Sequence, residues 1–433
     1  MAAEEALASA AAVADITPLH ALHYDLDRTG GLAPVTAPPY DVIDAAERAE
    51  LVARSPYNVV EIDLPQDPLG RDPYAHAAAL LHSWREDGIV VADPEPALWA
   101  LEQDYTGPDG RRRTRHGLFA RVRVKDYGPG KIRPHERTHP GPKEDRLRLT
   151  RATHANLSPI FSLYDGDAWS PLAPHLNGRP YGEVTDEDGT AHRLWRVGDA
   201  GAIAAVQEAL APAELLIADG HHRYETARVY ADEVGGEGGH RYVLMCLVAL
   251  QDPGLTIFPT HRLLTGLDDE RRVSLREAIR RDWDVEEVSE DELEPAPASD
   301  GRVRIGYLDA FHKRPLRLTL KDPAIADAAL PGKPPPYRRL DTAVTEALLL
   351  EGALGMSEDD ISHFRGLDYA RSTAEARERI GSGDVQAGLF MGPAPVELVR
   401  EVAAAGEVMP PKSTYFFPKV LTGLLFNPLG DGA

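Results

Sequence analysis

The sequence predicts a mixed α+β fold that is divided into more than one compact part. Segments with the alternating pattern of strands and segments with helical periodicity follow one another irregularly, unlike the strict alternation of a βαβ barrel. At 433 residues, the chain exceeds the length that one hydrophobic core usually supports, and its 43% hydrophobic residues can form a substantial core. We therefore expect two or three domains or lobes.

The first part of the chain predicts two helices and a β-hairpin after a loop-rich start. The helices are expected near Ala45–Arg54 and Tyr74–Asp87. Leu98–Tyr105 and Gly117–Lys125 alternate as strands do, and Gly107–Gly110 between them has the Gly-Pro-Asp-Gly sequence of a hairpin loop. A β-hairpin or meander should therefore follow the helices.

The second half predicts further strands and helices on both sides of an acidic connection. Asp284–Arg302 is acidic and contains Pro295, Pro297 and Ser299, which is typical of an exposed linker. The apolar run Arg241–Leu250 predicts a buried strand. Additional strands are expected at Arg302–Leu308, Leu316–Lys321 and Val385–Met391, and helices around Asp341–Glu351 and Thr373–Ile380.

The composition argues against nucleic-acid and membrane partners. Acidic residues outnumber basic ones, 69 to 47, and the formal net charge of −22 repels a polyanion. Met1–Ala14 lacks the regions of a signal peptide, and no apolar stretch reaches membrane-spanning length. The single cysteine, Cys246, lies in an apolar run and predicts a buried thiol without a disulfide. We expect a cytoplasmic protein, and the high Ala, Arg, Gly and Pro content with little Lys is typical of a high-GC bacterial genome.

The run from residue 215 to residue 227 predicts a strand, a tight turn and the start of a helix that faces an anion. Asp219 is expected to cap the helix, and Gly220 permits a tight turn with close backbone approach. His221, His222 and Arg223 add hydrogen-bond donors and positive charge where the first N–H groups of a helix are free. Metal ligation by the paired histidines or a purely structural loop are the alternatives. Phosphate binding is favoured because adjacent histidines chelate a metal poorly, whereas zinc sites on helices prefer i, i+4 spacing, and because the first N–H groups of a helix attract an anion.

Two further clusters contain groups suited to chemistry, at residues 134–138 and 410–419. Glu136 can take a proton from a hydroxyl, and Lys412, Ser413 and Thr414 can contact phosphate or a small polar substrate. A carboxylate base with clustered cations and N–H donors suits phosphoryl transfer, which depends on positioning and charge neutralisation. Walker A, kinase HRD and DFG, GxGxxG and GxSxG motifs are absent from the sequence.

These clusters carry a resemblance that spans nearly the whole chain. The DGHHR element resembles that of the ParB/sulfiredoxin superfamily, and PHE, LIADGHHR and PPKST in this order resemble the free-serine kinases, which make O-phospho-L-serine from L-serine and a nucleotide. The chain as a whole is similar to the bacterial DUF1015 family. The motifs shared with that family are PPYDVI at 38–43, KEDRL at 143–147, NLSPIF at 156–161, ADGHHRYETA at 218–227 and PPKSTYFFPK at 410–419.

The resemblance implies an architecture and a set of site residues. It implies an N-terminal α+β region at 1–130, a ParB/sulfiredoxin-like nucleotide-binding core at 131–265 and a C-terminal α+β region at 266–433. The donor would be ATP or ADP, with Mg²⁺ to neutralise its charge. Relative to the smaller archaeal kinases, this chain has a long N-terminal region and extra sequence between Glu136 and Asp219. The implied residues are Glu136, Asp219 and His222 for catalysis, Gly220, His221, His222, Arg223, Lys412 and Ser413 for nucleotide phosphate, and Thr414 and Tyr415 for the amino acid.

Three classes of function compete on these observations. The first is a kinase that phosphorylates free L-serine, the second a ParB-like nucleotide-binding or nucleotide-hydrolysing switch, and the third a catalytically silent structural protein. A DNA-partition protein should contain a helix-turn-helix and a basic face, and neither is evident. A sulfiredoxin-like reductase needs a cysteine where this chain has His221. The order and identity of the motifs favour the enzyme.

Overall fold

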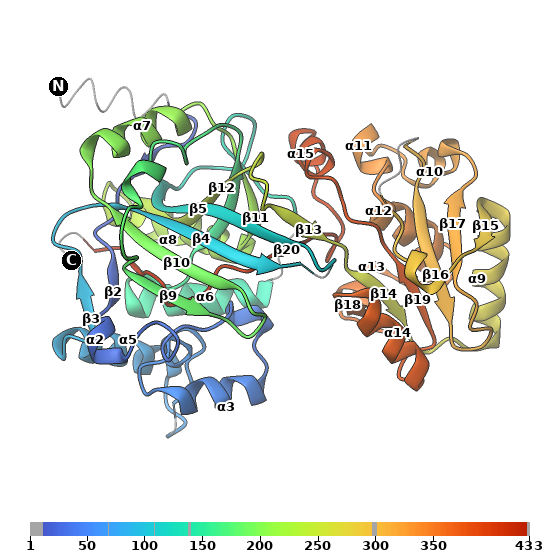
Figure 1. Cartoon of the computed structure of the whole chain (residues 1–433). Coiled ribbons are helices and arrows are strands. Elements are labelled where there is room, and N and C mark those ends of the chain that lie inside the picture. The colour runs from blue at the N-terminus through green and yellow to red at the C-terminus, as the bar shows by residue number, and fades with distance from the viewer. Residues whose placement is uncertain (1–11, 68, 108, 137–139, 297–300, 431–433) are drawn as a thin grey trace. The chain divides into compact units, whose positions relative to one another are not determined.

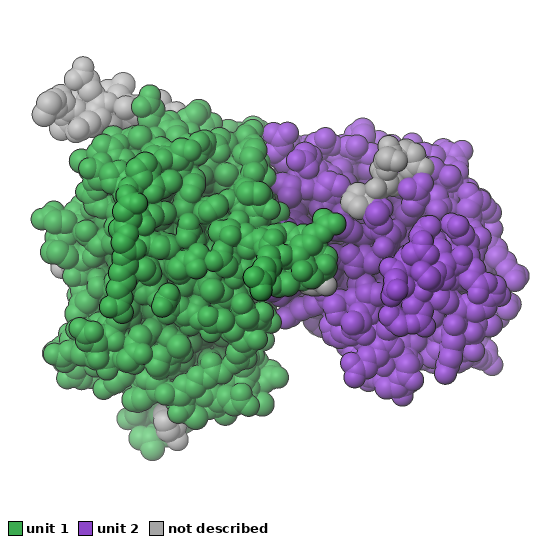
Figure 2. Space-filling model, in the orientation of Figure 1, with its two compact units in different colours: residues 1–134, 138–255, 418–433 green, residues 135–137, 256–417 purple. Residues whose placement is uncertain are grey.

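The computed structural model describes residues 12–67, 69–107, 109–136, 140–296 and 301–430 (Figure 1). For residues 140–142 it describes the backbone alone. The chain forms two compact units (Figure 2). Unit 1 comprises Met1–Pro134, Thr138–Leu255 and Pro418–Ala433, and unit 2 comprises His135–Arg137 and Thr256–Phe417. Helices and strands are mixed in both units, which confirms the α+β fold class. The three regions implied by the family resemblance, 1–130, 131–265 and 266–433, do not coincide with these two units, since unit 1 takes residues from all three.

Unit 1 is built on a mixed sheet of nine strands among the residues described. Its order is β6-β11-β8-β12-β5-β4-β10-β9, and β1 pairs with β5 beside this path. β11 pairs parallel to β6 and antiparallel to β8, whereas β12 pairs parallel to β8. The strands are β1 (Ile16–Thr17), β4 (Leu98–Thr106), β5 (Arg112–Arg123), β6 (Ile132–Arg133), β8 (Ile160–Tyr164), β9 (Gly182–Thr185), β10 (Ala191–Val197), β11 (Leu215–Asp219) and β12 (Tyr242–Ala249).

The predicted hairpin is confirmed as β4 and β5, which pair antiparallel from Trp99 opposite Phe119 to Thr106 opposite Arg112. β5 begins at Arg112 rather than near Gly117, because its charged first residues pair with the outer end of β4 and leave little apolar alternation to detect. The predicted strand around Cys246 is β12. The Cys246 side chain is fully buried, and burial raises the pKa of its thiol to about 12.

The helices of unit 1 begin at side-chain caps in several cases. Asp44, Asp72 and Asp199 each accept hydrogen bonds from first-turn N–H groups of α3, α5 and α7. α3 and α5 confirm the two helices predicted in this region. The helices are α2 (Leu26–Thr29), α3 (Ala45–Arg54), α4 (Val60–Asp63), α5 (Pro73–Glu86), α6 (Pro140–Thr153), α7 (Ala200–Leu210) and α8 (His221–Val234).

Helix α6 contains the KEDRL motif and packs against α8. The sequence pattern predicts a polar stretch here and no helix. Its buried positions include Arg146 as well as Leu147 and Leu149, so the buried face does not show as an apolar stripe.

The last residues of the chain return to unit 1 through short pairings. β21 (Asn427–Pro428) pairs with β7 (Ala155–Asn156), and Phe426 forms a bridge with Leu22. Phe426 is fully buried in a cluster that also contains Tyr24 and Trp84. A small ribbon of β2 (Leu22–Tyr24) and β3 (Val90–Ala92) lies in the same region. The C-terminal segment is therefore part of the core of unit 1.

Unit 2 is built on a six-stranded antiparallel sheet of order β15-β17-β16-β19-β14-β18, with β13 and β20 paired separately. The strands are β13 (Thr256–Phe258), β14 (His261–Leu264), β15 (Trp283–Glu287), β16 (Arg304–Asp309), β17 (Leu316–Leu320), β18 (Leu367–Ala370), β19 (Ala387–Phe390) and β20 (Tyr415–Phe417). The helices are α9 (Asp269–Asp282), α10 (Pro323–Ala329), α11 (Pro335–Arg338), α12 (Asp341–Thr345), α13 (Glu358–Ser362), α14 (Thr373–Ser382) and α15 (Val396–Ala404).

Most elements predicted in this region are confirmed, and one interpretation is wrong. β16, β17, β19, α14 and α12 with its π-helical continuation over Glu346–Glu351 lie where the sequence predicts them. The exposed connection at Asp284–Arg302, however, begins as β15, which pairs with β17 along its whole length. β15 is an edge strand with exposed acidic residues, and charged side chains on an edge strand hide its β character while protecting it from further pairing. Residues 297–300 lie outside the described part.

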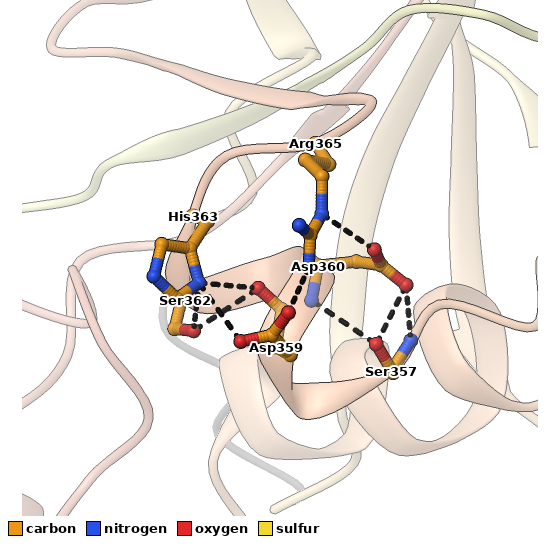
Figure 3. A network of polar contacts seen from close by, with 6 residues as sticks. All are labelled: Ser357, Asp359, Asp360, Ser362, His363 and Arg365. Carbon is orange, nitrogen blue, oxygen red and sulfur yellow. Dashed lines mark hydrogen bonds and ion pairs between the residues drawn. The ribbon is translucent and has the colours of Figure 1, made fainter.

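A polar network holds the short helix α13 and the turn after it (Figure 3). Ser357 and Asp360 form a reciprocal capping box at its first turn. Arg365 pairs with Asp359 and Asp360, and His363 Nδ1 lies 3.0 Å from an Asp359 carboxylate oxygen. All these charged side chains except Asp360 are exposed, and the turn after the helix contains Phe364, whose φ of 57° is left-handed.

Among the helices described, none combines the length and the apolar composition needed to cross a membrane.

Candidate phosphate-binding and proton-transfer residues

In unit 1, the run from Leu215 to Val234 folds as the sequence predicts, into a strand, a one-residue turn and a helix. β11 is buried from Leu215 to Ala218 because it lies between β6 and β8. Gly220 has a φ of 92° and ψ of 29°, a left-handed conformation that glycine adopts without strain. An added Cβ at Gly220 would also approach the Arg223 Nε to 2.9 Å. The helix α8 then starts at His221, so both histidines lie in its first turn.

The predicted capping role of Asp219 is wrong. Gly220 occupies the N-cap position of α8 and makes no side-chain cap hydrogen bond. The Asp219 carboxylate instead binds two cations: its Oδ2 accepts from Arg223 Nη2 at 2.7 Å, and its Oδ1 accepts from Lys419 Nζ at 2.9 Å. Both bonds join the carboxylate to a full positive charge, whereas a capping bond would join it only to an uncharged backbone N–H.

Asp219, Arg223 and Lys419 form a cluster of ion pairs at the start of α8. Because two of its three charges are positive, we call it the cationic trio. The three side chains are between 10% and 20% exposed. Burial would raise the pKa of the Asp219 carboxyl, but Lys419, Arg223 and His221 together hold that pKa well below its usual range. The ionised trio carries a net charge of one positive unit, next to the positive end of the helix dipole. An anion is therefore the ligand that this part of unit 1 favours.

Arg223 is held on two sides. Its Nη1 donates to the backbone oxygen of Pro159, which belongs to the NLSPIF motif. Its Nε is buried and has no hydrogen-bond partner among the described residues. A cavity of about 30 Å³ lies beside α8 and is lined by Asp63, Arg146 and Arg223 among others. The guanidinium is thus fixed by protein contacts before any ligand binds.

The remaining motifs of the first half lie around this arginine. Arg146 of the KEDRL motif donates to the Asp63 backbone oxygen at 2.7 Å and to its carboxylate at 3.1 Å. The Arg146 guanidinium lies 4.2 Å from the centre of the Tyr40 ring, in the PPYDVI motif. Burial raises the pKa of Tyr40 to about 12, against the opposing charges of Arg223 and Arg146. The PPYDVI, KEDRL, NLSPIF and ADGHHRYETA motifs therefore lie close together in unit 1.

Lys419 reaches Asp219 because a buried polar chain fixes the backbone before it. Arg115 is fully buried, and its Nη2 donates to Gln103 Oε1 at 2.5 Å and to the Pro418 oxygen at 2.6 Å. Gln103 Nε2 donates to the Lys419 oxygen at 3.0 Å. Burial lowers the pKa of Arg115 to about 10, so its guanidinium stays charged at neutral pH. Neither Arg115 nor Lys419 is among the site residues that the sequence predicts. The position of Lys419 as the last residue of the PPKSTYFFPK motif was the available signal.

In unit 2, Glu136 and the PPKST segment are neighbours. Glu136 forms a parallel bridge with Met409, and the Met409 N–H donates to the His135 oxygen at 2.7 Å. The Glu136 Oε1 accepts from the backbone N–H of Lys412 at 3.0 Å. Lys412 has a left-handed φ of 56°, which a non-glycine residue adopts at a cost of about 1 kcal/mol or more. The loop therefore orients the carboxylate through its backbone.

The next three residues are engaged with other parts of unit 2. The buried Ser413 hydroxyl contacts the Thr342 hydroxyl at 3.0 Å and the Pro410 oxygen at 2.7 Å. Thr414 Oγ1 lies 2.8 Å from His135 Nε2. The Tyr415 ring lies 5.4 Å from the Arg371 guanidinium. The roles predicted for Lys412 and Ser413 with phosphate, and for Thr414 and Tyr415 with an amino acid, stay predictions.

The sequence-predicted residues thus form two groups, each internally connected. Asp219, Gly220, His221, His222 and Arg223 belong to unit 1 with Lys419, and Glu136 with Lys412 to Tyr415 belongs to unit 2. His221 is buried and His222 is half-buried. The described residues hold no cluster of three or more His, Cys, Asp and Glu side chains that could bind a metal ion.

Comparisons with known proteins give distant structural likenesses. A free serine kinase variant solved with AMP is 14% identical, with a TM-score of 0.36 over 69% of this chain and 87% of that chain. A conserved hypothetical protein from Pyrococcus furiosus is 14% identical, with a TM-score of 0.34 over 69% and 90%. SbnI with a C-terminal truncation, from Staphylococcus aureus, is 13% identical, with a TM-score of 0.35 over 70% and 85%.

Among proteins with curated descriptions, none matches the sequence. A family model does match: DUF1015, described as a protein of unknown function, aligns with residues 16–343. The matched range includes Glu136 and the Asp219–Arg223 element, and it ends before the PPKST segment. Because this match covers most of its 433 residues, the chain belongs to the DUF1015 family.

Proposed function

We propose that this chain is a small-molecule kinase that transfers a phosphoryl group from a nucleotide to the hydroxyl of free L-serine. The observation that carries the proposal is the cationic trio of Asp219, Arg223 and Lys419 at the N-terminus of α8. The motif order PHE, ADGHHR and PPKST, which resembles that of the free-serine kinases, supports the choice of acceptor.

Unit 1 would hold the phosphates of the nucleotide. The first-turn N–H groups of α8 have no intrahelical acceptors, and the absence of a side chain at Gly220 lets the Arg223 guanidinium lie against the turn. Arg223 offers a forked contact to phosphate oxygens, and Lys419 adds a second cation. Because Asp219 holds both cations in place, little reorganisation is needed when the anion binds.

Glu136 would act as the general base. As the serine oxygen attacks the terminal phosphorus, the bond between that phosphorus and the leaving nucleotide oxygen breaks, and the carboxylate takes the hydroxyl proton. The Lys412 N–H binds one carboxylate oxygen of Glu136, and the proton would go to the other. With ATP the products are O-phosphoserine and ADP, and with ADP they are O-phosphoserine and AMP.

Mg²⁺ would be held by the nucleotide phosphates together with few protein oxygens. No carboxylate cluster that could form a protein-only cage is present in the described part of the chain. A magnesium ion bound mainly through phosphate and water fits this donor set, and it would neutralise charge on the transferred group.

The direct test is an acceptor assay with the purified full-length chain, Mg²⁺ and either ATP or ADP. We expect O-phosphoserine from L-serine, detected by mass spectrometry, and no product when L-alanine replaces it, because alanine lacks the hydroxyl. A panel of D-serine, L-threonine and L-homoserine defines the acceptor. Hydrolysis or binding of nucleotide without phosphorylation of any hydroxyl compound would refute the kinase and favour the ParB-like switch.

A further inference from the structure

Unit 2 contains a concave surface at the edge of its sheet. It has a volume of about 760 Å³ and is formed by α9, β15 and the turn between β16 and β17. Figure 1 shows α9 alongside β15 and β17. We call this surface the edge groove. Glu136, Lys412, Ser413 and Thr414 do not line it. Its volume is in the range of pockets that take small organic ligands.

The floor of the edge groove is apolar and exposed. Of the large apolar side chains that are exposed in the described part of unit 2, three of four line this groove: Val273 at 41%, Val285 at 48% and Phe311 at 47%. Leu316 adds further apolar surface. Exposed apolar side chains that gather in one hollow indicate a binding surface, whereas isolated ones are common on any protein.

The carboxylates in the lining are already engaged by the protein. Asp269 pairs with Arg272, and Glu287 pairs with Arg314. Asp309 accepts the backbone N–H of Phe311 at 2.9 Å and lies 3.1 Å from His312 Nδ1. The Arg272 guanidinium also lies 4.2 Å from the centre of the Phe311 ring, which fixes the ring at the wall of the groove.

Two arginines of the lining are not used in these ion pairs. Arg276 and Arg280 line the edge groove, are exposed, and make no ion pair within the described residues. They lie four residues apart on α9 and therefore face the same side of the helix. The lining thus holds four arginines against three carboxylates, in a chain whose net charge is −22. A local positive excess beside an apolar floor favours a ligand with the opposite charge and an apolar body.

We propose that the edge groove binds a small amphipathic anion, with its acidic group at Arg276 and Arg280 and its apolar body against Val273, Val285 and Phe311. The chemical class is a monocarboxylate or sulfonate on an aliphatic or aromatic body. This inference is independent of the kinase proposal, because its residues and elements differ from those around Glu136 and Asp219.

The test uses 8-anilinonaphthalene-1-sulfonate, whose fluorescence rises when its aromatic body leaves water, with the folded full-length chain. We expect saturable binding at one site. Arg276→Gln and Arg280→Gln should each raise the dissociation constant of the dye about tenfold. This is the effect of losing one charge-assisted contact of about 1.4 kcal/mol. Arg271→Gln is the matched control, because Arg271 is exposed on the same helix but does not line the groove.

A second pair of variants tests the apolar wall. Phe311→Ala should weaken binding of the dye severalfold, whereas Phe364→Ala, which removes the other exposed phenyl ring of unit 2, should not. Thermal unfolding of each variant verifies that the folded chain is compared. Equal effects of the groove and control variants would overturn the location of the site.

Competition defines the ligand class. Decanoate should displace the dye, and decanol, which has the same chain without the charge, should do so at least tenfold less well. Displacement by both compounds at equal concentration would overturn the anionic part of the proposal. Failure of decanoate together with displacement by an acidic amphipathic peptide would overturn the small-molecule class and assign the groove to a protein partner.

Discussion

At the scale of single residues, one arginine connects most of what is distinctive in unit 1. Arg223 binds Asp219 through one nitrogen and the backbone of Pro159 through another, while its Nε is buried without a partner. Asp219 in turn binds Lys419. A guanidinium held this way has a fixed direction, so its contribution to binding an anion carries little entropic cost.

Arg223→Ala should therefore weaken nucleotide binding more than serine binding. The loss of a forked, charge-assisted contact predicts a tenfold or larger rise in the dissociation constant for nucleotide. Titration calorimetry with each ligand measures the two effects separately. Arg228→Ala is the control, since Arg228 lies on the same helix but pairs with Asp126 at its surface. Unchanged nucleotide affinity in Arg223→Ala would make Arg223 a purely structural residue.

Glu136→Gln should leave the fold and nucleotide affinity nearly unchanged and lower turnover about 10²-fold or more, the usual scale for loss of a general base. The amide keeps the size of the side chain and can still accept from the Lys412 N–H. Single-turnover kinetics should locate the loss in the chemical step. Turnover near that of the unmodified chain would exclude Glu136 as the base, and Asp219 would become the next candidate.

Asp219 should also make stability depend on pH. The cations beside it hold the pKa of its carboxyl below the ordinary value of about 4, so its ionised form is stabilised in the folded state. That stabilisation is fully present above pH 4 and is lost as the pH falls toward the lowered pKa of the folded state. Asp219→Asn should therefore be less stable than the unmodified chain at pH 7, with a difference that shrinks below pH 4. Denaturant unfolding at both pH values measures this, and a difference independent of pH would contradict it.

At the scale of elements, side chains of the β4–β5 hairpin fix the position of a backbone segment from the end of the chain. β4 and β5 supply Gln103 and Arg115, and these side chains hold the backbone of Pro418 and Lys419 as the chain re-enters unit 1. The hairpin thereby determines where the Lys419 ammonium lies. A buried arginine within an otherwise apolar sheet is costly to keep charged. Arg115 is bound through Nε and Nη2, whereas its Nη1 is buried without a hydrogen-bond partner among the described residues.

Arg115→Met should destabilise unit 1 by roughly 1–3 kcal/mol, because it leaves Gln103 Oε1 and the Pro418 oxygen buried without that donor. It should also weaken nucleotide binding, since Lys419 loses the contact that fixes its backbone. Arg113→Met on the same strand removes a pair with Asp109 near the surface and a hydrogen bond to the Arg111 oxygen, and it should change stability by less than about 1 kcal/mol. Denaturant unfolding and nucleotide titration separate the two effects. Loss of stability with unchanged nucleotide affinity would restrict Arg115 to a structural role.

At the scale of the whole molecule, each unit has a hydrophobic core of its own, and the chain leaves unit 1 after Leu255 and returns to it at Pro418. The returning segment contributes Lys419 to the cationic trio, buries Phe426, and pairs β21 with β7. Unit 1 is therefore discontinuous in sequence, and its stability depends on residues that follow all of unit 2.

Removal of residues 418–433 should consequently loosen unit 1, although most of its sheet remains. Cys246 reports this directly, because its thiol is fully buried in β12 and its pKa is raised to about 12. In the full-length chain, Ellman's reagent at pH 8 should label Cys246 only on unfolding, whereas the truncated chain should be labelled at least tenfold faster. One thiol per chain should react in guanidinium chloride in both cases. Equal labelling rates of the two folded chains would show that the segment is dispensable for unit 1.

The sequence by itself determined those features that depend on neighbours along the chain. The strand, turn and helix from Leu215 to Val234, the buried strand of Cys246 and the β4–β5 hairpin follow from local periodicity and from residues such as Gly220 that permit special backbone angles. Family membership likewise follows from short sequence motifs, which can be recognised without a structure.

Only the tertiary structure decided which of these motifs share a neighbourhood. Asp219 looks like a helix cap when its sequence neighbours alone are considered, but Lys419, 200 residues away, binds its carboxylate instead. The Lys412 N–H and Glu136 are 276 residues apart and meet for the same reason. The acidic composition of β15 gives no strand signal in the sequence, and only its pairing with β17 identifies it as a strand. Such contacts arise when distant segments are brought together by burial of separate cores, and local propensity contains no information about which segments these are.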